Sequence, residues 1–182
     1  MSRELNLLEP DFEKKVRKLL VQCEKDGYPM KPFYTLRSVY DQAKLYRQSR
    51  PFFEIEGAST YLKERGAPYL ASVLIDVGPC SGNWATNALP GYSWHQHGEA
   101  VDCYWYIDKT AEWSTSRKHE GKNGYDVYAE NAAKLGLVSG HLWAQKDSVH
   151  VQKTSGSIRL LIDAGSMSLS ELDSKMKDTF DV

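Results

Sequence analysis

One stretch of the sequence decides how this chain is interpreted: Ser93-Trp94-His95-Gln96-His97-Gly98-Glu99-Ala100-Val101-Asp102. Residues 100–106 alternate in a way that predicts a strand, with Asp102 on one face and Cys103 on the other. An acid inside an apolar strand is costly unless it is paired, hydrogen-bonded or bound to metal. For Asp102 taken alone, a surface-facing residue on a half-exposed strand is the favoured interpretation. Gly98 permits a tight turn or a close backbone approach, so His95 and Asp102 can converge.

A second segment, Asp147-Ser148-Val149-His150, completes the pattern. His150 lies in a predicted short strand over 149–152 and in an apolar context. Zinc accepts a mixed set of two histidines and one aspartate, and a catalytic site leaves the fourth position open. We therefore expect one Zn²⁺ per chain, held by His95, Asp102 and His150. A turn at 146–148 would let Asp147 reach the water on the metal as a general base, although an ordinary turn aspartate is the simpler alternative.

The rest of the chain predicts a mixture of separated helices and strands, which is typical of the α+β class. We expect a small, mainly antiparallel sheet flanked by helices. Residues 31–36 form a loop that enters a short strand, residues 49–58 are irregular, and residues 80–92 form a long loop. The sequence predicts helices over 10–26, 38–47, 67–77 and 125–135, and one that opens at the capping box 168–171.

Composition excludes several classes of protein. The 182 residues predict a single domain, with 41% hydrophobic and 26% charged residues. The net charge of −1 gives no support to a nucleic-acid partner. No apolar run reaches the length of a membrane span, and acids interrupt the N-terminus where a signal peptide needs an apolar stretch. The sparse cysteines, Cys23, Cys80 and Cys103, do not indicate a disulfide framework.

These motifs resemble those of a known family. Ser-x-His-x-x-Gly-x-Ala-x-Asp at 93–102, followed by Asp-x-x-His at 147–150, is similar to the D-alanyl-D-alanine carboxypeptidase and L-alanyl-D-glutamate endopeptidase family of zinc peptidases. The resemblance spans roughly residues 30–152, with the elements in family order. It also includes Leu36-Arg37-Ser38, Gln42, Leu45-Tyr46, Thr86-Asn87-Ala88-Leu89-Pro90-Gly91 and Gly136-Leu137.

The resemblance implies a D-Ala-D-Ala peptidase or hedgehog-like fold, forming one zinc peptidase domain over residues 1–182. It implies an endolysin-like hydrolase that cuts stem peptides of bacterial peptidoglycan. His95, Asp102 and His150 would be the ligands and Asp147 the general base. Arg37 would hold a substrate carboxylate or stabilise the oxyanion. The other implied substrate-binding residues are Gln42, Ser93, His141 and Trp143.

The bond that is cut stays open between alternatives. Ser-Trp-His and His-Val-Gln resemble the branch that cuts L-Ala–D-Glu, so we expect that endopeptidase. A D-Ala-D-Ala carboxypeptidase or dipeptidase is the second interpretation. A non-catalytic zinc-containing module that binds cell wall is the third, and Asp147 and Arg37 argue against it. A domain without metal and with fortuitous histidines is the fourth.

One run departs from the family pattern. Ser139-Gly140-His141-Leu142-Trp143 stands where relatives often have Gly-Gly-Asp-Trp, which leaves substrate preference undecided. The insert 50–69 and the tail after 152 have no assignment. We expect a monomer without membrane insertion. We also expect synthesis in the cytoplasm and action on the wall after release or export.

Overall fold

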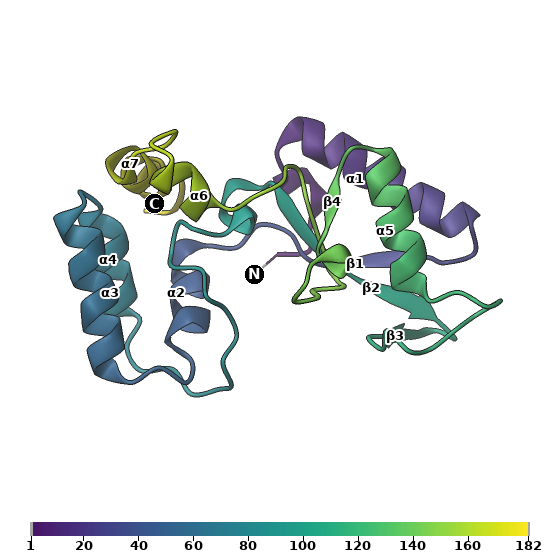
Figure 1. Ribbon diagram of the computed structural model, residues 1–182, viewed down its shortest axis with the longest axis horizontal. Coiled ribbons are helices and arrows are strands. Elements are labelled where there is room, and N and C mark those ends of the chain that lie inside the picture. Colours follow the sequence, from purple (N-terminus) through teal and green to yellow (C-terminus); the bar gives the residue numbers. More distant parts are fainter. Residues whose placement is uncertain (1, 182) are drawn as a thin grey trace. The chain divides into compact units, whose positions relative to one another are not determined.

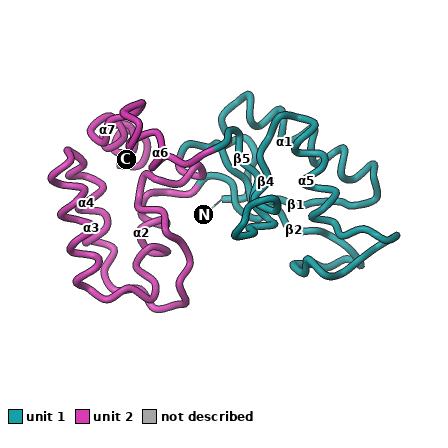
Figure 2. Tube along the Cα trace, viewed as in Figure 1, with its two compact units in different colours: residues 1–36, 97–155 teal, residues 37–96, 156–182 magenta. Residues whose placement is uncertain are grey.

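The computed structural model describes residues 2–181, whose helices and strands group into two units (Figure 2). The first unit contains the chain through Leu36 together with His97–Ser155. The second contains Arg37–Gln96 and the residues from Gly156 onward. Each unit is interleaved in sequence with the other, so neither is a continuous segment. The prediction of one domain over the whole chain stays a prediction.

The first unit is built on an antiparallel sheet of five short strands (Figure 1). The central strand β2 pairs with β1, β3 and β5, and β5 pairs with β4. Because every pairing is antiparallel, the expected sheet type is confirmed. The strands are β1 (Met30–Tyr34), β2 (Ala100–Ile107), β3 (Thr110–Glu112), β4 (Val138–Ser139) and β5 (His150–Gln152).

Two helices, α1 (Pro10–Lys25) and α5 (Gly124–Lys134), pack on one face of this sheet (Figure 1). The face of β2 that carries Val101, Cys103 and Trp105 forms one core with them, and Val151 of β5 joins it. Successive side chains of a strand point to opposite faces. Asp102 and His150, which alternate with these core residues, therefore belong to the face away from α1 and α5.

Close packing at the start of α5 depends on a missing side chain. A Cβ atom at Gly124 would lie 2.3 Å from the ring of Trp105, so only glycine lets α5 begin against this buried indole.

Burial raises the pKa of the Cys23 thiol to about 11 and that of Cys103 to about 12, which keeps both thiols protonated and unreactive. The cysteines of the described residues are free thiols, as the sequence indicated for Cys23 and Cys103.

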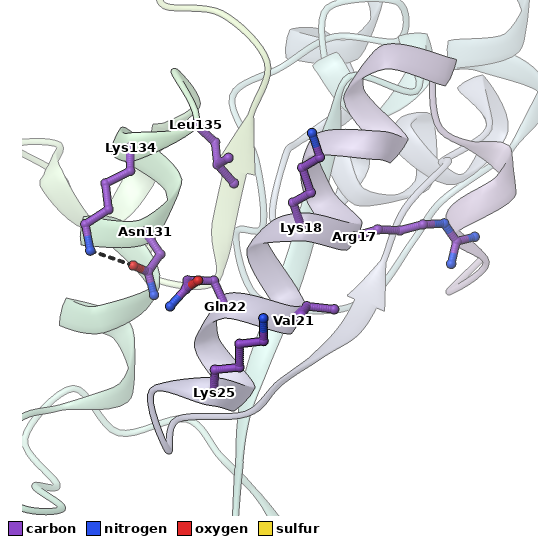
Figure 3. A pocket seen from close by; sticks show the side chains of 8 residues that line it. All are labelled: Arg17, Lys18, Val21, Gln22, Lys25, Asn131, Lys134 and Leu135. Carbon is purple, nitrogen blue, oxygen red and sulfur yellow. Dashed lines mark hydrogen bonds between the residues drawn. The ribbon is translucent and has the colours of Figure 1, made fainter.

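A groove of about 520 Å³ lies on the outer side of the first unit, between α1 and α5 (Figure 3). Lys134 donates a hydrogen bond of 2.9 Å to Asn131 inside it. The described residues that line the groove supply no carboxylate, imidazole or thiol, so it lacks the groups of a hydrolytic site. They are Arg17, Lys18, Val21, Gln22, Lys25, Asn131, Lys134 and Leu135.

The second unit is helical and has its own apolar core, to which Ile55, Leu74, Ile158 and Met176 belong. Its helices are α2 (Val39–Arg47), α3 (Phe52–Glu64), α4 (Pro68–Asp76), α6 (Ile158–Asp163) and α7 (Leu169–Phe180). The tail after 152, unassigned from sequence, thus completes this core with α6 and α7. Ser168 and Glu171 form the predicted capping box at the start of α7.

Side chains from other helices satisfy both ends of α4. Asp173 of α7 accepts hydrogen bonds from the backbone N–H groups of Tyr69 (3.2 Å) and Leu70 (2.8 Å). The buried Arg47 of α2 donates to the carbonyl oxygen of Leu74 at 2.8 Å. The first N–H and last C=O groups of a helix have no partner inside the helix. These buried polar residues therefore tie three helices together.

The expected irregular segment 49–58 is wrong, because α3 occupies Phe52–Glu64. The inward face of α3 carries Ile55, Ser59 and Leu62, while Phe52 and Phe53 are exposed. The predicted helices all lie close to their expected bounds, whereas α6 was not predicted. The long loop at 80–92 contains no helix or strand in the described chain. Over residues 2–181, no helix combines the length and apolarity that a membrane crossing requires.

Candidate metal centre

Asp102 is a buried carboxylate in the middle of the sheet. Its neighbours Val101 and Cys103 point into the core that α1 and α5 cover, which leaves Asp102 on the opposite face of β2. The residue is 7% exposed, so the surface-facing interpretation does not hold. A buried carboxylate requires a partner that offsets its lost hydration.

His150 supplies that partner from the adjacent strand. It opens β5 directly opposite Asp102 in the antiparallel register. Its Nδ1 atom lies 3.0 Å from Oδ1 of Asp102. Burial lowers the pKa of His150, but the hydrogen bond and charge of Asp102, with the charge of Asp147, outweigh burial and raise it. The pair is thus electrostatically coupled within one face of the sheet.

Gln152 holds the other side of the imidazole. Gln152 follows His150 by two residues on the same strand. The Oε1 atom of Gln152 lies 3.1 Å from Nε2 of His150. The amide Nε2 of Gln152 donates to the carbonyl oxygen of Thr154 at 2.6 Å, which orients Oε1 toward the ring. With Nε2–H donated to Gln152, Nδ1 is the ring nitrogen left to bind a metal.

His95 lies in the short 3₁₀-helix η2 (Trp94–His97), just before β2. Its side chain is buried, and with Asp102 and His150 it offers ligand atoms that all lie within 4.8 Å of one another. Two imidazoles and a carboxylate at this spacing fit the donor set of a zinc ion. Gly98 follows with φ +66°, and a Cβ there would lie 2.9 Å from the backbone nitrogen of Glu9. The close backbone approach expected at Gly98 is present.

Asp147 lies in the turn that leads into β5. Its backbone nitrogen donates to the carbonyl oxygen of Gly140 (2.9 Å), and its carbonyl oxygen accepts from the backbone nitrogen of His150 (3.2 Å). A Cβ at Gly140 would lie 2.5 Å from that carbonyl oxygen, so glycine permits this approach. The structure thus has a turn at 147–150, one residue later than the predicted turn at 146–148. The charge of Asp147 contributes to the raised pKa of His150.

His141 and Trp143 flank this turn in different ways. His141 is buried in η3 (Gly140–Leu142), with Nδ1 2.8 Å from Oγ of Ser148 and Nε2 2.9 Å from Oδ1 of Asp126. Both ring nitrogens therefore engage protein groups, which suits a role in fixing the turn. Trp143 is 38% exposed, and its ring centroid lies 5.3 Å from that of His150.

In the second unit, Arg37 lies between β1 and α2, beside the helix N-cap Ser38. Its backbone nitrogen donates to the carbonyl oxygen of His95 at 3.2 Å. Its guanidinium donates to Oε1 of Gln42 at 3.0 Å. The amide of the buried Gln42 donates in turn to the carbonyl oxygen of Ala88 at 2.8 Å. Gln42 thus restricts the side chain of Arg37, and the substrate-binding role that the resemblance implied for Gln42 stays a prediction.

Ser93 and its neighbours are held by a residue that the sequence reasoning missed. Oε1 of the buried Gln96 accepts hydrogen bonds from the backbone nitrogens of Gly91 (2.9 Å) and Ser93 (3.2 Å). Gln152 was missed as well. The two-residue period of a strand could have found it, because positions 150 and 152 share one face. No comparable sequence signal marks Gln96.

Comparisons with known proteins add a family and a set of similar structures. The profile of the VanY family, described as D-alanyl-D-alanine carboxypeptidase, matches residues 5–155. A comparison with curated protein sequences gave no match.

Three solved structures are similar at low identity. ChiX, the L-Ala D-Glu endopeptidase of Serratia marcescens, is 19% identical, with 82% of this chain and 83% of that chain covered and a TM-score of 0.47. The zinc complex of the D,D-pentapeptidase VanY from a VanB-type vancomycin resistance cassette is 16% identical, with 91% and 83% covered and a TM-score of 0.46. The LD-carboxypeptidase LdcB is 17% identical, with 92% and 69% covered and a TM-score of 0.48.

Proposed function

The chain belongs to the VanY family of D-alanyl-D-alanine carboxypeptidases, and on this premise we propose that it is a zinc-dependent L-alanyl-D-glutamate endopeptidase. Whichever bond is cut, the chain is a peptidase that acts on peptidoglycan peptides. The observation that carries the proposal is the convergence of ligand atoms from His95, Asp102 and His150 within 4.8 Å.

We propose that these three residues hold one zinc ion and leave a position open. The donor set fits: all three side chains are buried, and their types match those of hydrolytic zinc sites. When bound, the ion supplies Lewis acidity that activates a water molecule and polarises the scissile carbonyl. Burial of the ligands excludes bulk water and strengthens these electrostatic effects.

Asp147 is the proposed general base. Its carboxylate accepts the proton of the attacking water and delivers it to the departing amine, so the residue is restored at the end of the cycle. The turn fixed by Gly140 and His150 holds its backbone on both sides. A positioned base of this kind contributes about 10²–10⁴-fold to the rate.

Arg37 is the proposed anchor for a substrate carboxylate. Stem peptides are rich in carboxylates, and a guanidinium binds a carboxylate through two parallel hydrogen bonds. The hydrogen bond to Gln42 restricts the side chain before substrate arrives, which lowers the entropy lost on binding. In the same proposal Ser93 and Trp143 contact the substrate.

The choice of bond follows from motif likeness. Ser-Trp-His at 93–95 and His-Val-Gln at 150–152 resemble the branch that cuts between L-Ala and D-Glu. The alternative is a D-Ala-D-Ala carboxypeptidase, which the family description favours. The substrate lies outside the cytoplasmic membrane, so the enzyme reaches it after release or export.

Digestion of purified muropeptides, followed by mass spectrometry, tests the proposal. An endopeptidase of the proposed kind releases a stem peptide that begins with D-Glu, whereas the alternative releases one D-Ala. The His150→Ala variant is the negative control, because it removes a ligand. Release of D-Ala alone would assign the alternative. No product from the zinc-loaded enzyme on either bond would refute both.

A further inference from the structure

A cluster of aromatic residues lies on β1, on β2 and directly after β3, strands whose courses Figure 1 shows, and the proposed chemistry does not use it. Trp113 is exposed, and the other three residues are half-buried. We call Phe33, Tyr34, Tyr104 and Trp113 the aromatic platform. The ring centroids of Phe33 and Tyr34 are 4.1 Å apart. Those of Phe33 and Trp113 are 5.0 Å apart, and those of Tyr104 and Trp113 are 5.5 Å apart. The four rings thus form one continuous group.

Strand register places this platform next to the proposed metal ligands. Tyr34 lies directly opposite Asp102 in the β1–β2 pairing. Tyr104 follows Asp102 by two residues on the same face of β2, which is a distance of about 6.6 Å along a strand. The pairing shifts between Pro32 and Tyr34, an irregularity that redirects side chains at the edge of a sheet. The platform is therefore a continuation of the Asp102 face.

Hydrogen bonds hold the backbone on both sides of Trp113, although the residue itself is 49% exposed. The carbonyl oxygen of Glu112 accepts from the hydroxyl of Tyr125 at 2.8 Å. On the other side of Trp113, the carbonyl oxygen of Ser114 accepts from Asn123 at 2.9 Å. A large aromatic side chain that stays exposed on a rigid backbone suits ligand binding, because little order has to be gained on contact.

We infer that the aromatic platform binds a sugar ring of the peptidoglycan glycan chain, the ring that carries the stem peptide. The inference rests on the proposed function. Flat aromatic faces accept the C–H face of a pyranose, because ring faces are negative and C–H groups are weakly positive. The tyrosine hydroxyls can exchange hydrogen bonds with sugar hydroxyl and acetamido groups.

The distances in this inference favour one bond. In a stem peptide the first residue, L-Ala, is joined to the sugar through its lactyl group, and D-Glu follows. Each residue extends a chain by at most about 3.6 Å. If the scissile L-Ala–D-Glu bond lies beside Asp102, the sugar is therefore as far from Asp102 as Tyr104 and its neighbour Trp113 are. A terminal D-Ala–D-Ala bond lies several residues farther from the sugar, and its cleavage leaves the platform without this ligand.

The test compares two substrates for the same zinc-loaded enzyme. One is the free stem peptide, and the other is the same peptide on N-acetylmuramic acid. We expect the wild type to favour the sugar-bearing substrate in kcat/KM by about 5-fold, mainly through KM. The Trp113→Ala variant should bring this ratio close to one. The Phe53→Ala variant should keep the wild-type ratio, since Phe53 is an exposed aromatic residue outside the platform. Equal kcat/KM values for the two substrates in the wild type would overturn the inference.

A binding experiment separates this inference from the proposed function. Saturation-transfer NMR on the His150→Ala variant, with the disaccharide of N-acetylglucosamine and N-acetylmuramic acid, needs no catalysis. We expect transfer from protein aromatic protons to sugar ring protons, and its loss in His150→Ala/Trp113→Leu. Transfer without any peptide cleavage by wild type would refute the proposed function and keep the platform. Cleavage without transfer would refute the platform and keep the function.

Discussion

Gln152 illustrates how one side chain can orient a proposed metal ligand. Its amide nitrogen is committed to the carbonyl oxygen of Thr154, so its oxygen faces Nε2 of His150. Partners of this kind fix the tautomer of a ligating histidine and raise its basicity. The residue lies beyond the proposed ligands and would act through His150 only.

We predict that Gln152→Leu weakens zinc binding by about 10- to 100-fold, because the tautomer of His150 is then no longer fixed. Competition with a chromophoric chelator measures the zinc Kd directly. Gln152→Glu retains an acceptor oxygen and should lose less affinity. A zinc Kd unchanged in Gln152→Leu would show that other contacts orient His150.

Asp147 provides the second test at the residue scale. Asp147→Ala should lower kcat by about 10²- to 10⁴-fold while zinc content stays at one per chain, because the proposed base is removed and no ligand is. Elemental analysis and kinetics on a muropeptide measure the two quantities. Asp163→Ala, at an exposed position in α6, is the matched control. Near-normal turnover in Asp147→Ala would assign the base to another carboxylate.

Arg37 tests whether the geometry of a cation matters or only its charge. Arg37→Lys preserves the charge but cannot reproduce a two-pronged carboxylate contact. We predict a loss of about 10-fold or more in kcat/KM, since charge-assisted hydrogen bonds contribute ~1.5–3 kcal/mol. Zinc content and Tm should barely change. Unaltered kcat/KM on a purified stem peptide would place Arg37 outside the active site.

At the scale of elements, the sequence predicted those with a clear period or cap. The strand at 100–106 and the helices at 10–26 and 125–135 were predictable because their apolar residues follow one repeat. The helix α3 was not predictable, because Ser59 interrupts the apolar pattern of its inward face. The hydroxyl of Ser59 donates to the carbonyl oxygen of Ala71 at 3.3 Å. Exposed Phe52 and Phe53 further obscure its apolar stripe.

The turn before β5 shows the same limit inside the candidate site. The sequence predicted a turn at 146–148, and the motif suggested Asp147 as the base. It could not predict that both ring nitrogens of His141 engage Ser148 and Asp126, because those partners come from separate segments. The side-chain partners of a buried polar residue depend on tertiary packing, which a local pattern does not contain.

The start of α1 carries an ion pair that should make stability depend on pH. Glu9 caps the helix by accepting from the backbone nitrogen of Phe12 at 2.9 Å, and Lys153 donates to it at 2.9 Å. The hydrogen bond from Lys153 and the one from Phe12 lower the pKa of Glu9 below its ordinary value of 4.5. A carboxyl group with a lowered pKa stabilises the fold above its unfolded-state pKa. That contribution is lost as pH falls through the folded-state pKa.

We therefore predict that Glu9→Gln lowers Tm by about 2 °C at pH 7, the size expected for a partly exposed pair. The difference from wild type should shrink once pH falls below 4.5 and vanish well below it. Thermal unfolding followed by circular dichroism between pH 3 and about 7 measures this trend. Glu24→Gln, elsewhere on the same helix, is the control. A Tm difference that is constant with pH would contradict the assignment to charge.

At the scale of the whole molecule, the sequence predicted family membership correctly. The motifs at 93–102 and 147–150 indicated it, and the family match over residues 5–155 confirms it. The sequence did not predict that the chain forms two units, each built from separated segments. That division depends on α6 and α7 joining the core around α4, and contacts between residues about 100 positions apart leave no local pattern.

The proposed zinc ion should stabilise the whole protein, because His150 is distant in sequence from His95 and Asp102, and the three ligands gather only in the folded chain. A ligand that binds only the native state at 100 times its Kd adds about 2.7 kcal/mol to the free energy of unfolding. For a chain of this length we predict that zinc raises Tm by about 5–10 °C over the chelator-treated protein. Differential scanning calorimetry measures the shift, and elemental analysis should find one zinc per chain. The His150→Ala variant should show neither the rise in Tm nor the bound zinc. The His119→Ala variant, altered at an exposed histidine, should show both the rise in Tm and one zinc per chain. A wild-type Tm that does not respond to zinc would contradict the proposed site.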